Sequence, residues 1–137
     1  MEPIRFTSSS DGTRLAYAVT GSGIPLIKAP NWITHLEHDS GFWGHWLDAL
    51  SARHTFVRFD QRGCGLSDRN PAEVSFEAWV RDLEAVADVA GFERAMAAVV
   101  AQRPAVVPIF LRRGWRTSFV FLEPKWSELS VAGAGSR

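Results

Sequence analysis

The sequence predicts an α/β fold built on a mostly parallel sheet with an antiparallel start. Three observations predict it. Short apolar runs alternate with segments whose apolar residues recur at helical spacing, which is typical of strands interleaved with helices. Asp11-Gly12 separates two alternating segments near the start and is typical of a tight hairpin. An apolar run at 55–59 ends in an acid and an Arg-Gly-x-Gly turn, as expected just past a buried strand.

Three strands are expected before the first helix. The first, at 4–7, and the second, at 15–19, alternate apolar with polar residues on either side of the Asp11-Gly12 turn. The third, at 26–29, lies between two prolines, which fit the ends of a strand because no ladder hydrogen bond is lost there.

Two helices follow from apolar residues at helical spacing. Residues 31–41 are predicted as a polar loop, and 42–50 as a short amphipathic helix. The most regular apolar stripe predicts a helix over 75–90. Ser75 is its expected N-cap, and Gly91 supplies its stop.

The compositional character of the chain changes near Arg94. Residues 1–94 hold nine basic and thirteen acidic residues, whereas residues 95–137 hold six and two. We therefore divide the chain into a first segment, 1–94, and a divergent, partly disordered segment, 95–137. A domain boundary or a shifted reading frame would each produce such a change.

The divergent segment holds weaker signals. Residues 95–101 are apolar but rich in alanine, so strand and helix both stay open. Residues 117–122 are a further strand candidate, and 131–137 are expected to be a frayed tail.

Length and charge exclude several classes of protein. The 137 residues suit one small domain, and the zero net charge gives no reason to expect nucleic acid as a partner. Cys64 is the single cysteine, so an internal disulfide is excluded and a reducing compartment is favoured. The sequence shows neither a signal peptide nor an apolar run long enough for a membrane span. We expect a cytoplasmic protein without a membrane partner.

Residues 60–68, Asp-Gln-Arg-Gly-Cys-Gly-Leu-Ser-Asp, resemble the Asp-x-Arg-Gly-x-Gly-x-Ser motif after strand 4 of α/β-hydrolase-fold proteins. Residues 11–17 and 20–26 resemble that family's opening hairpin and the approach to its strand 3, and 76–94 resemble the segment before its nucleophile strand. The amino-acid sequence of these segments is most similar to hydrolase-like domains of bacterial proteins that sometimes also carry regulatory or cyclase modules. The resemblance covers about residues 1–94 and implies an incomplete α/β-hydrolase fold.

The resemblance assigns two kinds of residue. It makes the backbone N–H of Trp32 an oxyanion-hole candidate, although Pro30-Asn31-Trp32 stands where the family usually has His-Gly. It gives Asp60 and Arg62 a structural role, in which their charged side chains hold the motif loop in place by charge-assisted hydrogen bonds. The motif is completed by Gly63, Gly65, Ser67 and Asp68.

The resemblance also places a nucleophile, in Gly-x-Ser-x-Gly, about ten residues after Arg94. Residues 98–104, Ala-Val-Val-Ala-Gln-Arg-Pro, occupy that place, and Gly-x-Ser-x-Gly occurs nowhere in the sequence. All four histidines precede the expected position of the nucleophile, and the chain ends before the family's acid and histidine are expected. We therefore expect an inactive homologue with no catalytic residue and no cofactor, whose full-length relatives act on small molecules.

Two other functions stay open. The chain could serve as a non-catalytic module that binds a small ligand or a protein, or as a hydrolase with an unconventional nucleophile such as Cys64. His35-x-x-His38 has the elements of a metal site but lies in the predicted loop, so solvated side chains are favoured and no metal is expected. Residues 112–116, Arg-Arg-Gly-Trp-Arg, fit a solvated turn better than a phosphate site.

Self-association is expected at one edge of the sheet. In the family the third strand lies beside the nucleophile strand, so its loss leaves 26–29 as an apolar edge, which templates pairing with another chain. Residues 95–111 or a second copy of the chain would be needed to cover it.

Overall fold

The computed structural model describes residues 2–28, 34–92, 96–98, 119–121 and 130–132. Its main sheet has five strands in the order β1-β2-β4-β3-β5. The strands are β1 (Arg5–Ser8), β2 (Arg14–Thr20), β3 (Ile24–Lys28), β4 (His54–Phe59) and β5 (Met96–Ala98). The pairings β1·β2 and β2·β4 are antiparallel, and β4·β3 and β3·β5 are parallel. The predicted α/β fold with an antiparallel start is confirmed.

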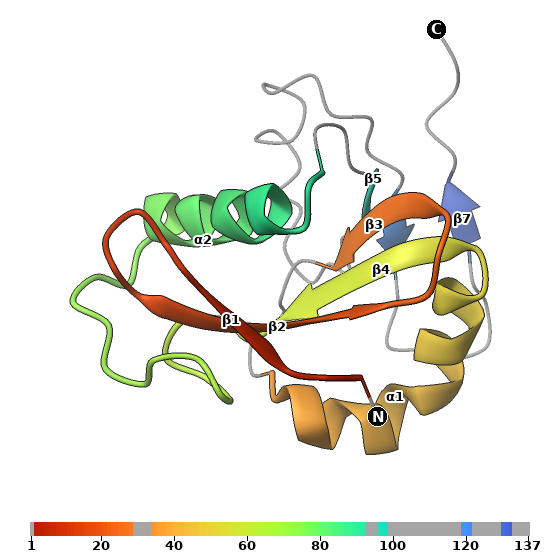
Figure 1. Ribbon diagram of the computed structural model, residues 1–137, viewed down its shortest axis with the longest axis horizontal. Coiled ribbons are helices and arrows are strands. Elements are labelled where there is room, and N and C mark those ends of the chain that lie inside the picture. Colours follow the sequence, from red (N-terminus) through yellow and green to blue (C-terminus); the bar gives the residue numbers. More distant parts are fainter. Residues whose placement is uncertain (1, 29–33, 93–95, 99–118, 122–129, 133–137) are drawn as a thin grey trace, which may run out of the picture.

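The two helices, α1 (Leu36–Ser51) and α2 (Phe76–Val89), cover opposite faces of the sheet (Figure 1). Side chains alternate between these faces along each strand. On β4, Val57 and Phe59 belong to the core under α2, and Phe56 packs with Leu26 toward α1. The core under α2 also contains Leu15, Tyr17, Ile27, Leu83, Val86, Ala87 and Phe92.

Helix α2 follows the sequence prediction closely. The Oγ of Ser75 accepts a hydrogen bond from the N–H of Ala78 at 3.1 Å, so Ser75 is the N-cap. After the last turn Gly91 takes a φ of +75°, and the N–H of Phe92 donates back to the carbonyl of Ala87. This is the Schellman arrangement, which only a residue tolerant of positive φ closes without strain.

Helix α1 begins six residues earlier than predicted, so the expectation of a loop reaching Gly41 is wrong from Leu36 onward. Leu36 is buried, and its N–H donates to the carboxylate of Asp60. This tertiary contact caps the helix, whereas the side chain of His35, at the N-cap position, makes no cap hydrogen bond. The sequence around residue 36 shows no local start signal because the capping group is Asp60, which directly follows β4.

The strands beyond Gly91 settle several open predictions. Residues 96–98 form a strand, and the candidate at 117–122 is confirmed over β6 (Phe119–Phe121). β6 pairs antiparallel with β7 (Ser130–Ala132) in a separate two-stranded sheet. The frayed tail expected at 131–137 is therefore wrong at Val131 and Ala132, and residues 133–137 lie outside the described residues.

The expected apolar edge on β3 is wrong over Leu26–Lys28. These residues pair in parallel with Met96–Ala98, so the edge is covered from within the chain. Cover by residues 95–111 was one of the two alternatives that the sequence analysis left open. Residue 94 lies outside the described residues, and β5, beyond the expected boundary, joins the sheet of the first segment. Self-association stays a prediction. Within the described residues no helix has the length and apolar character to cross a membrane.

Candidate functional site

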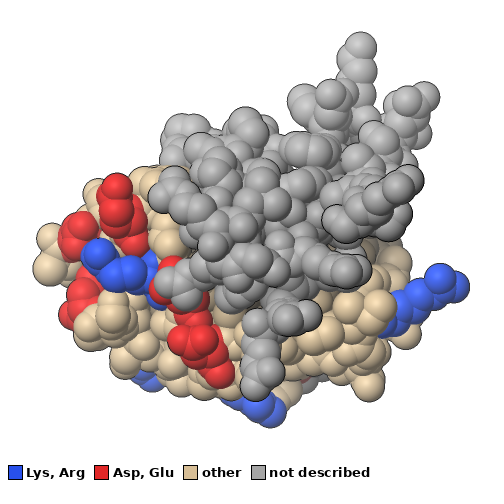
Figure 2. Space-filling view, turned by 90° about the horizontal axis from the view of Figure 1, so that it is seen from above, with Lys and Arg blue, Asp and Glu red and all other residues tan. Residues whose placement is uncertain are grey.

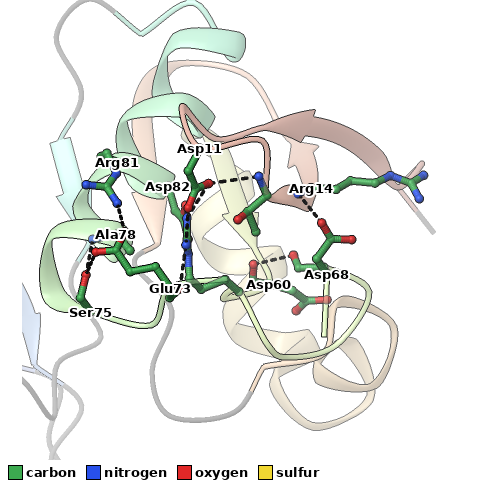
Figure 3. Close-up of polar contacts among 12 residues, drawn as sticks. Asp11, Arg14, Asp60, Asp68, Glu73, Ser75, Ala78, Arg81 and Asp82 are labelled. Carbon is green, nitrogen blue, oxygen red and sulfur yellow. Dashed lines mark hydrogen bonds and ion pairs between the residues drawn. The ribbon is translucent and has the colours of Figure 1, made fainter. Parts of the chain in front are cut away.

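The loop at 60–68 follows β4 at the carboxyl ends of two parallel strands, β3 and β4. Sites in α/β sheets form outside these strand ends, because loops there can vary while the sheet holds them. Figure 3 labels Asp60 and Asp68 of this loop together with Asp11 from the hairpin turn and Asp82 from α2.

Asp60 is fully buried and joins two segments. Its Oδ2 accepts hydrogen bonds from the N–H of Leu66 at 2.8 Å and from the N–H of Leu36 at 3.3 Å. A carboxylate at the start of α1 is also favoured by the helix dipole. Its Oδ1 has no hydrogen-bond donor in the part of the chain that the structure describes. Asp60 therefore holds the motif loop against the first turn of α1.

The two motif glycines are required for different reasons. Gly63 has a φ of +81°, but a Cβ there would meet only the carbonyl of Arg69, at 3.9 Å. Gly65 has a φ of +52°, and its Cβ would lie 2.1 Å from the Oδ2 of Asp60 and 2.8 Å from the carbonyl of Thr34. At residue 63 the positive φ alone favours glycine. At residue 65 the positive φ and the close approach of Asp60 both require it.

Ser67 and Asp68 continue the pairing of β2 after β4 has ended. The Oγ of Ser67 accepts from the N–H of Ala16 at 2.9 Å and donates to the carbonyl of Asp60 at 2.7 Å. The Oδ2 of Asp68 accepts from the N–H of Arg14 at 2.8 Å, and the N–H of Asp68 donates to the Arg14 carbonyl at 2.9 Å. These contacts satisfy β2 backbone groups that would otherwise lack a strand partner.

Arg62 is buried at the centre of a second network. Its Nε and Nη2 donate to the two carboxylate oxygens of Asp82 at 2.7 and 2.6 Å. Its Nη1 and Nη2 donate to Asp11 at 2.8 and 3.2 Å, and Nη1 also donates to the carbonyl of Glu73 at 2.8 Å. A guanidinium has five N–H donors, so the side chain is fully used. Arg62 thus ties the β1–β2 turn, α2 and the segment before α2 to the motif loop.

This network shifts the pKa values of Arg62 and Asp11. The hydrogen bonds that Arg62 donates to Asp82 raise the pKa of Arg62 despite the opposing effect of burial. The hydrogen bond from Arg62, with those from Thr13, holds the pKa of Asp11 well below its usual range. Both shifts favour the charged forms, so Arg62 and Asp11 stay ionised at neutral pH.

A second ion pair lies on the surface beside the first. Arg81 donates to Glu73 at 2.7 Å, and hydrogen bonds from Ser75 and Arg81 lower the pKa of Glu73. Figure 2 views the α2 side and shows acidic side chains gathered around basic ones at one end of the molecule. Both partners of this pair are well exposed, so it contributes little to stability.

Arg58 is a buried charge that the sequence analysis missed. Its Nη1 donates to the carbonyl of Leu36 at 2.9 Å, and its Nε and Nη2 both donate to Glu2. Burial raises the pKa of Glu2, but the hydrogen bond and charge of Arg58 outweigh this and lower it overall. The apolar pattern of β4 favoured an apolar environment at residue 58, and its counter-ion lies 56 residues away, so no local signal identified the pair.

Other predicted site residues are not brought together. Trp32 lies outside the described residues, as do 99–104 of the expected nucleophile segment and 112–116. His35 and His38 lie at the start of α1 with ring centroids 4.1 Å apart, yet no group of three metal-ligating side chains occurs among the described residues. Cys64 is half-buried in the motif turn, where its N–H donates to the carbonyl of Gln61.

Comparison with known proteins gives the class. No family model matches the chain. A protein named "Putative carbamate hydrolase RutD", from Azorhizobium caulinodans, is 33% identical over 81 residues, covering 59% of this chain and 29% of that protein. An alpha/beta hydrolase from Sphaerobacter thermophilus superposes with a TM-score of 0.59 at 27% identity, covering 69% of this chain and 35% of its own. The esterase RhEst1 from Rhodococcus sp. ECU1013 superposes with a TM-score of 0.69 at 29% identity, covering 85% and 45%.

The chain therefore has the α/β-hydrolase fold, as the motif at 60–68 implied. It spans less than half the length of each of these three proteins.

Proposed function

We propose that this chain supplies the strand-end framework of an α/β-hydrolase site and does not itself hydrolyse esters through a covalent serine. The observation that carries this proposal is the use of the motif's polar side chains. The hydroxyl of Ser67 is buried and bonded to Asp60 and to Ala16, and the guanidinium of Arg62 is buried with all its donors engaged. Neither group is free to attack or to bind a substrate.

The sequence supports the same conclusion, because it contains no Gly-x-Ser-x-Gly elbow. Loss of the nucleophile or its base in a serine hydrolase site removes about 10⁶-fold in kcat. In the family one oxyanion-hole donor is the N–H of the residue after the nucleophile, so a chain without the elbow also lacks that donor. We expect turnover close to that of buffer.

The substrates of longer relatives are a separate proposal. RutD is named as a carbamate hydrolase and RhEst1 as an esterase, so a small acyl compound is the substrate class that a longer relative of this chain would accept. One fold hosts many chemistries, so this proposal rests on the relatives and not on the fold.

The test uses the purified chain, p-nitrophenyl acetate and a fluorophosphonate probe, with an active esterase as positive control. We expect no turnover above buffer and no probe adduct by mass spectrometry. Saturable labelling of any side chain would overturn the proposal. If the adduct maps to Cys64, and Cys64→Ala abolishes both labelling and turnover, the chain is a hydrolase with an unconventional nucleophile.

Self-association through an edge of the sheet is an additional proposal. Among the described residues β5 is the strand beyond β3 and pairs with no further strand. Unpaired strand edges template association with another chain. Sedimentation velocity over a range of concentrations tests this, and a monomer throughout would contradict it.

A further inference from the structure

Asp11-Gly12 is the one Asp-Gly pair in the sequence, and it lies in the hairpin turn between β1 and β2. An aspartate followed by glycine is open to an intramolecular reaction, in which the backbone nitrogen of the glycine attacks the side-chain carbonyl carbon of the aspartate. A larger residue after the aspartate slows this attack, because its Cβ shields the nitrogen. This pair is therefore the place in the chain where such a reaction is least hindered by the following side chain.

The reaction converts aspartate to isoaspartate through a cyclic intermediate. The bond between the glycine nitrogen and the aspartate Cγ forms, one molecule of water leaves, and the product is a succinimide ring. Water then adds back and opens the ring. When the bond that breaks is the one between the nitrogen and the original main-chain carbonyl carbon, the main chain runs through Cβ and Cγ and is longer by one carbon. No oxidant, reductant or further reactant is required.

The fold requires both members of this reactive pair. Gly12 takes a φ of +86°, which favours glycine, although no atom of the described residues lies within 4 Å of the Cβ that another residue would add. The two carboxylate oxygens of Asp11 accept from the Nη1 and Nη2 of Arg62 at 2.8 and 3.2 Å. Arg62 is buried, so a different residue at position 11 would leave its guanidinium short of acceptors. The folded structure thus depends on a pair of residues that is chemically labile.

The folded chain also restrains both reacting groups. The N–H of Gly12 donates to the carbonyl of Ser9 at 2.9 Å, which holds the nitrogen within the turn. The Oδ1 of Asp11 accepts from the N–H of Thr13 at 3.1 Å in addition to the bond from Arg62. The hydrogen bonds from Arg62 and Thr13 hold the pKa of this carboxyl well below its usual range, so it stays ionised. A carboxylate is attacked by a nucleophile far more slowly than a carboxylic acid, because its carbon already carries the negative charge of two oxygens.

We propose that Asp11 is a site of isomerisation to isoaspartate, at which Arg62 holds the side chain unreactive until the contact between the motif loop and the hairpin turn opens. The side chain of Asp11 is 25% exposed, and segments near the surface open locally without global unfolding. In the product the free carboxylate is attached directly to Cα, one carbon closer to the main chain than before, so it no longer reaches Arg62 in the same place. The modification therefore makes the loss of this contact irreversible. This inference is independent of the proposed function.

Peptide mapping locates and measures the product. The folded wild-type chain is incubated at neutral pH beside a synthetic peptide of residues 6–14, which is also the fragment that trypsin releases around Asp11. The aspartate and isoaspartate forms have the same mass, so they are separated by chromatography and identified by electron-transfer fragmentation. We expect isoaspartate at residue 11 to form about tenfold faster in the peptide, or faster still, because the peptide lacks the contact with Arg62.

Arg62→Lys tests the contact itself. One ammonium cannot bond both oxygens of Asp82 and both oxygens of Asp11, so isoaspartate at residue 11 should form about tenfold faster than in the wild type. Val86→Ala is the matched control, because it removes core volume under α2 and leaves the turn untouched. Urea is added to the more stable of the two variants until both have the same free energy of unfolding, and Arg62→Lys should still react faster.

Two aspartates serve as internal controls in every sample. Asp48 and Asp88 lie on α1 and α2 and are followed by alanine and valine, so both should keep the aspartate form. The chain that carries isoaspartate at residue 11 is then purified and unfolded in urea. We expect a lower midpoint than for the unmodified chain, because Arg62 has lost one of its two carboxylate partners.

Three results would overturn the inference. The first is the absence of isoaspartate from the peptide, and the second is an equal rate in the peptide and in the folded wild type. The third is an equal rate in Arg62→Lys and Val86→Ala at matched stability. If Arg62→Lys does not fold, the comparison of the peptide with the wild-type chain decides, and an unchanged urea midpoint of the isoaspartate form would then contradict the role of Asp11 as an anchor for Arg62.

Discussion

Replacing Arg62 with methionine should destabilise this protein more than any single surface change. The substitution keeps an unbranched apolar stem but removes five donated hydrogen bonds. Asp82, which is 1% exposed, then keeps a buried carboxylate without its guanidinium. Asp11 is about a quarter exposed, so water can replace part of what it loses.

The magnitude follows from the burial of Asp82. Removing one partner of a buried ion pair costs about 3–5 kcal/mol, because the remaining charge is left in a poorly solvated site. Single domains have total stabilities of about 5–15 kcal/mol, so the loss is a large share of the total. Arg62→Lys should cost less, since an ammonium keeps the charge but cannot bond both oxygens of Asp82 in a fork.

Urea unfolding followed by far-UV circular dichroism measures these losses. Arg62→Met should lower the midpoint with an unchanged slope, or leave the chain unfolded in buffer. Adding Asp82→Asn to Arg62→Met should recover part of the loss, because the stranded charge is removed. Arg81→Met is the matched control, since it removes a surface arginine next to the same network.

The outcome that refutes this reasoning is simple to recognise. If Arg62→Met lowers the midpoint no more than Arg81→Met, the buried network does not stabilise the fold. If the double variant is less stable than Arg62→Met alone, the cost does not arise from the stranded carboxylate of Asp82.

Two further predictions concern the glycines and pH. Gly65→Ala should greatly destabilise the protein or prevent folding, because the new Cβ would lie 2.1 Å from Asp60. Gly63→Ala should cost only about 1–2 kcal/mol, because its positive φ is the only obstacle. Equal unfolding midpoints of the two variants in urea would contradict this prediction. Stability should fall as pH drops below about 5, since Asp11 has a lowered pKa in the folded state and the unfolded chain takes up the proton first. Asp11→Asn should flatten this dependence between pH 5 and 3, and a curve parallel to that of the wild type would show that Arg62 does not hold the charge.

Local patterns in the sequence were sufficient for elements whose signals lie within the element. Helix α2 has its cap at Ser75, its apolar stripe and its stop at Gly91 within one continuous segment, and the structure matches the prediction. Helix α1 differs because its start depends on Asp60, which lies 24 residues beyond Leu36. A capping group from another element leaves no trace in the local sequence.

The same distinction applies to the candidate site. The motif at 60–68 was found because its turn residues are contiguous. The partners of Arg62, at Asp11 and Asp82, are 51 and 20 residues away, and either could have paired with another cation by sequence alone. Arg58 was missed because a strand buried on both faces predicts apolar side chains, and a charge in such a strand becomes explicable only when its counter-ion is located.

The engagement of Arg62 has an electrostatic consequence for chemistry at this end of the sheet. One guanidinium shared by two carboxylates leaves the trio with an excess negative charge, and the most conspicuous cation of the motif cannot attract or neutralise an anion. An anion at this end of the sheet would thus find no compensating cation in the motif. The groups left to meet it there are main-chain N–H donors, whose placement depends on the backbone conformation and not on side-chain identity.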